Sequence, residues 1–391
     1  MSEFDLEEIT DRAGTGAPNF TYGFNINGSD SGISAFTHTV GATEPSSPSN
    51  GDTWWDTGND VYKVYIDSEW KDWLGTTPAS GLTSNGDRGF VVGEDNYLNT
   101  IQYWDITTVG NASDFGDLTS GTEDAGGTCS GTRAIVFFGT TGGSGYPTSY
   151  PPTIDYFATA TTGNATDFGD STTQASRKNG LSDGTYGLCA GSAGALTGAA
   201  SYVGNLDVID YVTIDTTGNA TDFGNLSEAK SGVVTTNDNT RGVFVGGASS
   251  QSPAQVNTME YVTIATTGNA TDFGDDLTTN YMGSRGVMGD GTYGVWQNGY
   301  TGSAYYSNVI AYITIQTTGN ATDFGDISTT KRQCQATSNA TKGHIAGGRS
   351  TVTSGVTDIE EITIATPGNA SDFADLHRGV YQSGGLSGAA S

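Results

Sequence analysis

The sequence predicts an all-β protein whose larger part is a six-bladed β-propeller. The main observation is a segment, Thr-Gly-Asn-Ala-Thr-Asp-Phe-Gly, that recurs six times with small changes. Its asparagines lie 49 to 55 residues apart, a period that suits a four-stranded propeller blade. No stretch shows the 3.6-residue apolar period of a helix, and 58 of the 391 residues are glycine. The six asparagines are Asn111, Asn164, Asn219, Asn269, Asn320 and Asn369.

Each repeat carries the pattern of four strands, most clearly in its fourth copy. An apolar strand at residues 241–247 ends at two glycines, and a polar loop leads to an aromatic, β-branched strand at residues 259–264. Gly268 and Asn269 then turn the chain, because both tolerate a positive φ, and residues 270–274 return it. A further strand, such as residues 230–235, precedes the next glycine-stopped strand. The glycine-stopped strands begin near Phe90, Ile135, Leu188, Val243, Val295 and His344, and the strands of the tyrosine type follow at Tyr103, Tyr156, Tyr211, Tyr261, Tyr312 and Glu361.

One phenylalanine stands at the same place in every repeat. A ring fixed in this way is best explained by packing between neighbouring sheets, which would bury most of its surface. We therefore expect these residues in the core: Phe115, Phe168, Phe223, Phe273, Phe324 and Phe373.

The order of apolar strand, double glycine, loop, aromatic strand and turn resembles the kelch repeat over about residues 80–385. Gly246-Gly247 and Gly347-Gly348 match the double glycine best, whereas Gly93-Glu94 and Asn298-Gly299 depart from it. The resemblance implies a propeller and leaves its activity open. A propeller must close to avoid an open sheet edge. We expect the C-terminal residues 379–382 to supply the closing strand, with residues 80–83 as the alternative.

We expect residues 41–78 to form a small module. The propeller follows it and spans residues 79–391. Gly-Asp-Thr-Trp-Trp-Asp at residues 51–56 and two following β-rich segments predict a three-stranded meander. The motif resembles short Gly-Asp-x-Trp-x-Asp modules of bacteriophage fibre proteins. Its tryptophans either pack together, since so small a sheet is marginal alone, or form an aromatic platform for sugars. They are Trp54, Trp55, Trp70 and Trp73.

Residues 1–40 predict an extended N-terminal arm. Gly, Asn and Ser dominate it, and residues 11–20 resemble the leader of phage structural proteins. An arm that orders when it attaches to other virion proteins fits this composition, and a flexible tail is the alternative.

Charge and composition argue against several kinds of partner, membrane segment and catalytic or metal site. The net charge is −28, so a nucleic acid is not an expected partner. The sequence has no apolar run long enough for a membrane span and no basic, apolar leader, so we expect no signal peptide or transmembrane segment. The widely spaced Cys129, Cys189 and Cys334 suggest neither disulfides nor a zinc site, and no pattern calls for a cofactor or a catalytic triad. The recurring aspartates leave calcium open, because one carboxylate per blade does not establish a site.

The loops after the glycine-stopped strands are the expected binding surface. They vary in length while the framework repeats, and strand alternation places them on one face. They combine Gly, Ser and Thr with six tyrosines, which offer rigid contact area and a hydroxyl group. These candidate ligand-binding residues are Tyr146, Tyr150, Tyr202, Tyr300, Tyr305 and Tyr306.

Together these features predict a non-enzymatic phage virion protein located at the tail or particle surface. We expect a tail-fibre or receptor-binding component that recognises a host surface glycan or protein through its propeller loops. The alternatives are a capsid decoration or connector protein without a ligand and, third, a glycan-degrading enzyme, which needs two suitably spaced carboxylates. A homo-oligomer is left open.

Overall fold

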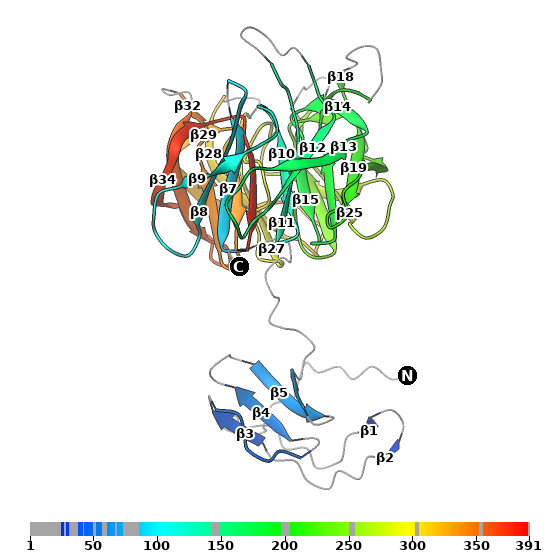
Figure 1. Cartoon of the computed structure of the whole chain (residues 1–391), viewed down its shortest axis with the longest axis vertical. Helices are drawn as coiled ribbons and strands as arrows, with labels where there is room; N and C mark the ends of the chain where they lie inside the picture. The colour runs from blue at the N-terminus through cyan, green and yellow to red at the C-terminus, as the bar shows by residue number, and fades with distance from the viewer. Residues whose placement is uncertain are drawn as a thin grey trace. The chain divides into compact units, whose positions relative to one another are not determined.

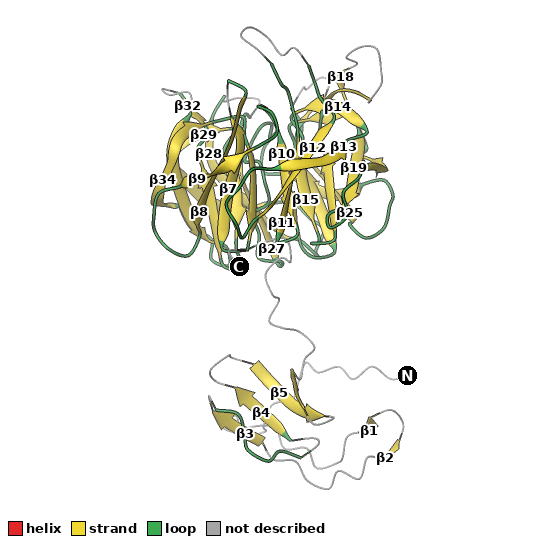
Figure 2. Cartoon of the chain, viewed as in Figure 1, coloured by secondary structure: helices red, strands yellow, loops and turns green. Residues whose placement is uncertain are grey.

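The computed structural model consists of strands and turns, and no helix occurs among the residues that it describes (Figure 2). These are residues 25–26, 29–30, 38–41, 43–49, 52–56, 61–66, 69–72, 86–94, 96–142, 149–196, 204–249, 255–301, 305–351 and 355–389. The all-β class is therefore confirmed. The chain divides into two compact units, Met1–Pro78 and Ala79–Ser391, which we describe separately.

The first unit contains a sheet with one strand more than the three expected. Its strands, in order, are β3 (His38–Gly41), β4 (Thr53–Asp56), β5 (Val61–Ile66) and β6 (Glu69–Asp72). The last three form the expected antiparallel meander, whereas β3 runs parallel to β4. The indole N–H of Trp54 donates to the carbonyl oxygen of Gly41 at 2.8 Å and so holds β3 in place. This strand lacks an alternating apolar pattern, which is why the sequence did not reveal it.

Strand β3 begins inside residues 1–40, the segment expected to be an arm. Two further short strands of that segment, β1 (Asn25–Ile26) and β2 (Ser29–Asp30), pair with each other. Most of the expected arm lies outside the described residues.

The second unit contains six four-stranded sheets, numbered here in the order of the repeats (Figure 1). Neighbouring strands within them are antiparallel. Sheet 1 is β35 (Gly384–Gly388), β7 (Arg88–Glu94), β8 (Leu98–Asp105) and β9 (Ser113–Asp117). Sheet 2 is β10 (Gly126–Cys129), β11 (Arg133–Phe137), β12 (Thr153–Ala158) and β13 (Thr166–Asp170). Sheet 3 is β15 (Asn179–Ser182), β16 (Tyr186–Ala190), β19 (Val208–Thr213) and β20 (Thr221–Asn225).

The remaining three sheets follow the same plan, with one exception. Sheet 4 is β22 (Val234–Asn237), β23 (Arg241–Val245), β25 (Thr258–Thr263) and β26 (Thr271–Asp275), and sheet 6 is β30 (Gln335–Ser338), β31 (Lys342–Ala346), β33 (Val356–Thr363) and β34 (Ser371–Val380). Sheet 5 is β27 (Tyr293–Gln297), β28 (Ser307–Thr314), β29 (Thr322–Arg332) and β32 (Arg349–Ser350). In place of a first strand, sheet 5 has isolated bridges from Gly289 to Gly294 and from Arg285 to Gln335.

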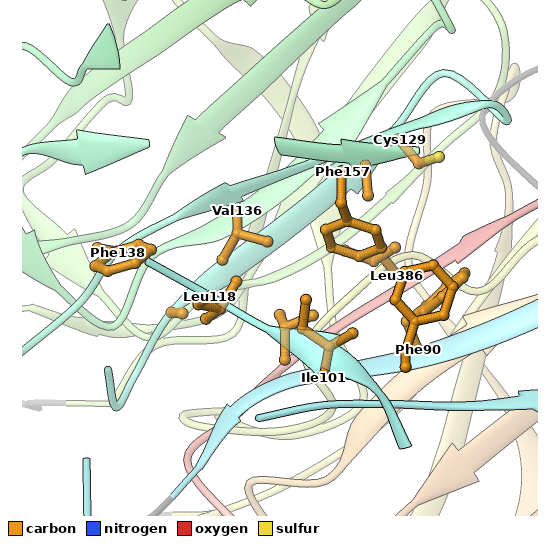
Figure 3. Close-up of a cluster of buried hydrophobic side chains, with 12 residues drawn as sticks. Phe90, Ile101, Leu118, Cys129, Val136, Phe138, Phe157 and Leu386 are labelled. Carbon is orange, nitrogen blue, oxygen red and sulfur yellow. The ribbon is translucent and has the colours of Figure 1, made fainter. Parts of the chain in front are cut away.

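The hydrophobic core lies between successive sheets. In the cluster of Figure 3, Phe90 and Ile101 of sheet 1 pack with Val136 and Phe157 of sheet 2. Five further clusters join sheets 2 and 3, 3 and 4, 4 and 5, 5 and 6, and also 6 and 1. The recurring phenylalanines are 2 to 7% exposed, so they belong to this core as expected.

Each hairpin is bonded to the phenylalanine strand of the preceding repeat. Asn219 Oδ1 accepts a hydrogen bond from the backbone N–H of Asp170 at 3.1 Å, and the N–H of Ala220 donates to the carbonyl of Asp170 at 2.8 Å. The same asparagine contact occurs in all six repeats. Gly169 has a φ of 148°, and a Cβ there would lie 2.5 Å from the carbonyl carbon of Gly218. The repeated motif thus encodes the contact between sheets as well as a turn.

The C-terminal segment completes sheet 1, but with residues other than those expected. Gly379 and Val380 belong to the end of β34, and the strand that pairs with β7 is β35. Between them Gln382 takes a φ of 58°, so the chain bends before the new strand begins. The alternative, residues 80–83, lies outside the described residues.

Candidate functional site

Six residues with a left-handed backbone conformation precede the first strands of five sheets and, in sheet 5, the segment that takes the place of a first strand. Their φ values lie between 54° and 65°. This conformation costs a non-glycine residue about 1–2 kcal/mol and must be compensated by other contacts. These kink residues are Asp124, Arg177, Gly232, Met282, Gln333 and Gln382.

Backbone hydrogen bonds link the kink residues of successive repeats. The N–H of Arg177 donates to the carbonyl of Asp124 at 3.0 Å, and the N–H of Gly232 donates to the carbonyl of Arg177 at 3.2 Å. Equivalent bonds join Gly232 to Met282, Met282 to Gln333 and Gln382 to Asp124. These bonds offset the strain and bring side chains from distant repeats together.

The kink residues and the variable loops lie at the same end of the sheets. Each first strand is antiparallel to its glycine-stopped strand, so the start of one lies beside the end of the other, as in the pair Val234 and Val245. We call this end the loop face. In Figure 1 it carries the short strands β14 (Thr173–Ser176), β18 (Gly204–Asn205) and β32 at the top of the unit.

A buried ion pair connects two distant repeats at the loop face. Arg285 Nη2 lies 2.6 Å from Asp124 Oδ1, and the two side chains are 3% and 7% exposed. The backbone of Arg285 is fixed by hydrogen bonds with Cys334 and Ala336 of sheet 6, at 2.9 and 2.6 Å. Its second terminal nitrogen, Nη1, is buried and has no hydrogen-bond partner among the described residues.

A second guanidinium group shares the same carboxylate. Arg177 Nε lies 3.8 Å from Asp124 Oδ2, and the Arg177 side chain is 38% exposed. Gln382 Nε2 donates to the same oxygen at 3.4 Å. Two positive groups therefore surround one negative group.

Three tyrosines continue outward from this charged group. The Arg177 guanidinium carbon lies 5.9 Å from the centre of the Tyr281 ring. Tyr281 and Tyr300 exchange backbone hydrogen bonds and pack edge to face at 6.3 Å, and Tyr300 packs against Tyr305 at 4.9 Å. Tyr305 is 66% exposed. Burial raises the pKa of Tyr281, while the two guanidinium groups oppose this shift. We call Asp124, Arg285, Arg177, Tyr281, Tyr300 and Tyr305 the Arg–Tyr row.

The structure brings only some of the expected loop tyrosines together. Tyr300 and Tyr305 belong to the Arg–Tyr row, and Tyr306 lies beneath the guanidinium of Arg332 at 5.3 Å. Tyr150 is partly buried near Tyr97, whose pKa is raised by burial and by nearby carboxylates. Tyr146 and Tyr202 lie outside the described residues.

Sequence reasoning missed Tyr281 and the three charged residues of the row. They lie at the starts of the repeats' first strands or, in sheet 5, in the segment that replaces one, and the repeats share no motif there. The only available signal was an arginine beside a glycine, Arg285-Gly286, at a place where the other repeats have small or uncharged residues.

The two tryptophans of the first unit whose side chains the structure describes, Trp54 and Trp70, pack against each other. Trp54 is 4% exposed and packs edge to face with Trp70 at 5.7 Å. Lys63 Nζ lies 5.3 Å from the Trp54 ring. A buried ring cannot offer a free face to a sugar, so Trp54 fits the packing explanation. The side chain of Trp55 and all of Trp73 lie outside the described residues.

Buried carboxylates on the tyrosine strands connect neighbouring sheets. Glu260 accepts from the N–H of Ser227 at 3.0 Å and pairs with Lys230 at 3.0 Å. Asp155 accepts from the N–H of Thr119 at 2.8 Å in the same way. No described lysine or arginine pairs with Asp155, and burial raises its pKa to about 6. Burial likewise raises the pKa of Asp276, before sheet 5, to about 6.

Among the described residues, neither a metal-binding cluster nor a membrane-spanning helix adds to this description of the loop face, and comparison with known proteins gives no match. Within the described ranges, no group of three or more His, Cys, Asp or Glu side chains is placed to hold a metal ion. No helix among the same residues is long and apolar enough to cross a membrane. Neither a protein-family model nor a curated protein matches the chain.

Proposed function

We propose that the six sheets are the blades of a closed, kelch-like β-propeller. The support is cyclic contact between sheets, because the core cluster of Val91 and Phe373 joins sheet 6 to sheet 1. Pairing of β35 with β7 brings the C-terminal end of the unit into sheet 1. In such a ring, β35 covers the edge of β7, so sheet 1 has no unpaired edge where the first and last strands of the unit meet.

We further propose that the chain is the receptor-binding component of a phage virion. Its N-terminal segment would attach to other virion proteins, and its loop face would recognise the host surface. The observation that carries this proposal is the Arg–Tyr row, which combines exposed Tyr305 with a partly exposed arginine on the face where the repeats vary. Aromatic and arginine side chains dominate recognition surfaces generally.

The Arg–Tyr row favours a role in recognition over the role of a passive spacer protein. A spacer needs only the repeated framework, whose contacts involve the hairpins and the sheets. Tyr305 takes no part in those contacts and remains largely exposed. Exposed aromatic rings and cationic groups on the same face are common features of binding sites.

The test is binding of the labelled full-length protein to an array of bacterial surface polysaccharides and outer-surface proteins. We expect binding to be lost in the variant Tyr305→Ala with Arg177→Gln. Val109→Ala is the matched control, because Val109 is 74% exposed in a hairpin at the opposite end of sheet 1. Equal binding by the loop-face variant would contradict the proposal, as would failure of antibodies against the protein to label virions.

A further inference from the structure

Two arginines lie directly opposite each other at the loop face, where β29 of sheet 5 pairs with β32. Arg332 is the last residue of β29, and its partner across the strands is Arg349, the first residue of β32. Opposite residues of an antiparallel pair project from the same face of the sheet, with Cβ atoms about 4.5–5.5 Å apart. Like charges in this position repel each other and destabilise the strand pair. We call Arg332 and Arg349 the arginine pair.

No carboxylate compensates the arginine pair within the part of the chain that the structure describes. Neither arginine forms an ion pair there. On the adjoining strand β33, Asp358 and Glu360 pair instead with the buried Lys331, at 3.0 and 2.8 Å. The Nε atom of Arg332 is buried and has no hydrogen-bond partner among the described groups. Buried donors of this kind are rare and call for a partner such as water, an ion or a ligand.

The loops of this face contain almost no acidic residues, although 43 of the 391 residues of the chain are acidic. In repeats 2 to 6, the loops after the glycine-stopped strands contain a single one, Asp207. An anion therefore meets less repulsion at these loops than the net charge of −28 suggests. The loops are residues 139–153, 191–207, 247–257, 298–308 and 347–357.

A tyrosine ring lies beside each member of the arginine pair. The guanidinium carbon of Arg332 is 5.3 Å from the centre of the Tyr306 ring, and that of Arg349 is 5.6 Å from the centre of the Tyr381 ring. All four side chains are partly exposed. Stacking restrains a guanidinium group without using its N–H donors, so an anion at the surface can still bind them.

We propose that the arginine pair binds a phosphate group of a surface glycan. A phosphate monoester has a charge of about −1.5 to −2 at pH 7, which balances two guanidinium groups, whereas a carboxylate balances one. Its oxygens also accept parallel N–H hydrogen bonds from the planar guanidinium groups. The choice of phosphate rests on the arginine pair, and the choice of a glycan as its carrier rests on the proposed recognition function.

The test is calorimetric titration of the full-length protein with glucose 6-phosphate. Glucose is the neutral probe, and glucuronic acid is the probe with a single negative charge. We expect glucose 6-phosphate to bind at least tenfold more tightly than either and to be displaced by inorganic phosphate. Equal affinity for glucose would overturn the inference, and equal affinity for glucuronic acid would overturn the choice of phosphate.

Variants locate the site. We expect Arg332→Gln and Arg349→Gln each to weaken binding of glucose 6-phosphate at least tenfold, and Arg332→Lys to weaken it less, because lysine keeps the charge but cannot form two parallel bonds. Arg133→Gln is the matched control, since Arg133 also stacks on a tyrosine, Tyr156 at 4.9 Å, but at the start of β11, away from the loop face. Unchanged affinity in both glutamine variants of the pair would refute the assignment.

Thermal unfolding separates binding from a purely structural role. Without phosphate, Arg332→Gln should melt at the same temperature as the unaltered protein or higher, because the repulsion between like charges is removed. Inorganic phosphate should raise the melting temperature of the unaltered protein more than that of the variant. An equal rise in the two proteins would show that phosphate binds elsewhere.

The phosphate site and the recognition function fail in different ways. If loop-face variants bind the array as the unaltered protein does while glucose 6-phosphate still binds the arginine pair, the phosphate site stands and its role in host recognition is wrong. If the array binding is lost in Tyr305→Ala with Arg177→Gln but glucose 6-phosphate binds no better than glucose, recognition stands and the phosphate site is wrong.

Discussion

Asn111 Oδ1 accepts a hydrogen bond from the backbone N–H of Asp375 at 3.2 Å, across 264 residues of sequence. It is the same contact that Asn219 makes with its neighbour, Asp170 of the preceding repeat. In the first repeat no repeat precedes, and the partner comes from the last one instead. A local motif therefore serves both to connect neighbours and to join sheet 6 to sheet 1.

Loss of one such contact should lower stability measurably. We expect Asn219→Ala to reduce the free energy of unfolding by about 0.5–1.5 kcal/mol, because one hydrogen bond between sheets is lost. Urea denaturation measures the change. Thr217→Ala, in the exposed part of the same hairpin, should have little effect. A result in which both variants match the unaltered protein would mean that the asparagine contact contributes nothing.

The bulge glycine of the motif should not tolerate a side chain. Gly224 has a φ of 151°, and a Cβ there would lie 2.5 Å from the carbonyl carbon of Gly268. We expect Gly224→Ala to destabilise the protein by about 2 kcal/mol or more, because the adjoining hairpin must move. Repeat 6 has Ala374 at this place, so the reverse change Ala374→Gly is the comparison and should cost about 1 kcal/mol or less. Thermal unfolding of both variants tests this difference.

The strand β35 should be essential for the stability of the second unit. Leu386 is 3% exposed and packs in the cluster that contains Phe90 and Phe157. We expect Leu386→Ala to cost about 2–5 kcal/mol and Leu386→Met to cost less, since methionine nearly conserves the volume. Deletion of residues 384–391 removes the strand and should lower the melting temperature further, whereas deletion of residues 390–391 should not. A truncated protein that melts like the full chain would exclude β35 from a stabilising role.

Removing only the carboxylate of the ion pair between Asp124 and Arg285 should lower the free energy of unfolding strongly. Asp124→Ala leaves a guanidinium group buried without its carboxylate, for which about 3–5 kcal/mol of destabilisation is expected. Glu123→Gln changes the neighbouring residue but keeps its acceptor for Asn96, and we expect a small effect. Chemical denaturation compares the two. Equal stabilities would show that solvent already reaches the pair.

The buried carboxylate of Asp155 should make stability depend on pH. Its pKa is raised from 3.8 to about 6 by burial, so the folded state favours the protonated form. The resulting contribution is complete below about pH 4 and is lost as the pH rises through 6, by up to about 3 kcal/mol. We expect Asp155→Asn to gain stability relative to the unaltered protein over this interval, as measured by denaturation at pH 4, 5, 6 and 7. Parallel pH profiles for the two proteins would contradict the assignment.

Local pattern was sufficient for most strands of the six repeats and for the phenylalanine core. Phe223 and its equivalents could be placed because every repeat gives the same residue at the same distance from the turn. The closing strand was placed near the correct terminus but too early, since nothing local marks Gln382 as a bend. Strand β3 was missed because parallel pairing with β4 is a contact between segments and leaves no alternation in its own residues.

The sequence by itself determined the all-β class, the six repeats and the variable loops, because each follows from residues within about one repeat length. The tertiary structure decided the candidate site. Asp124 and Arg285 are 161 residues apart and lie in repeats with no shared motif at those positions. They meet because backbone bonds between successive kink residues draw the starts of the first strands together. Such contacts depend on how whole sheets pack, and no periodicity along the chain records them.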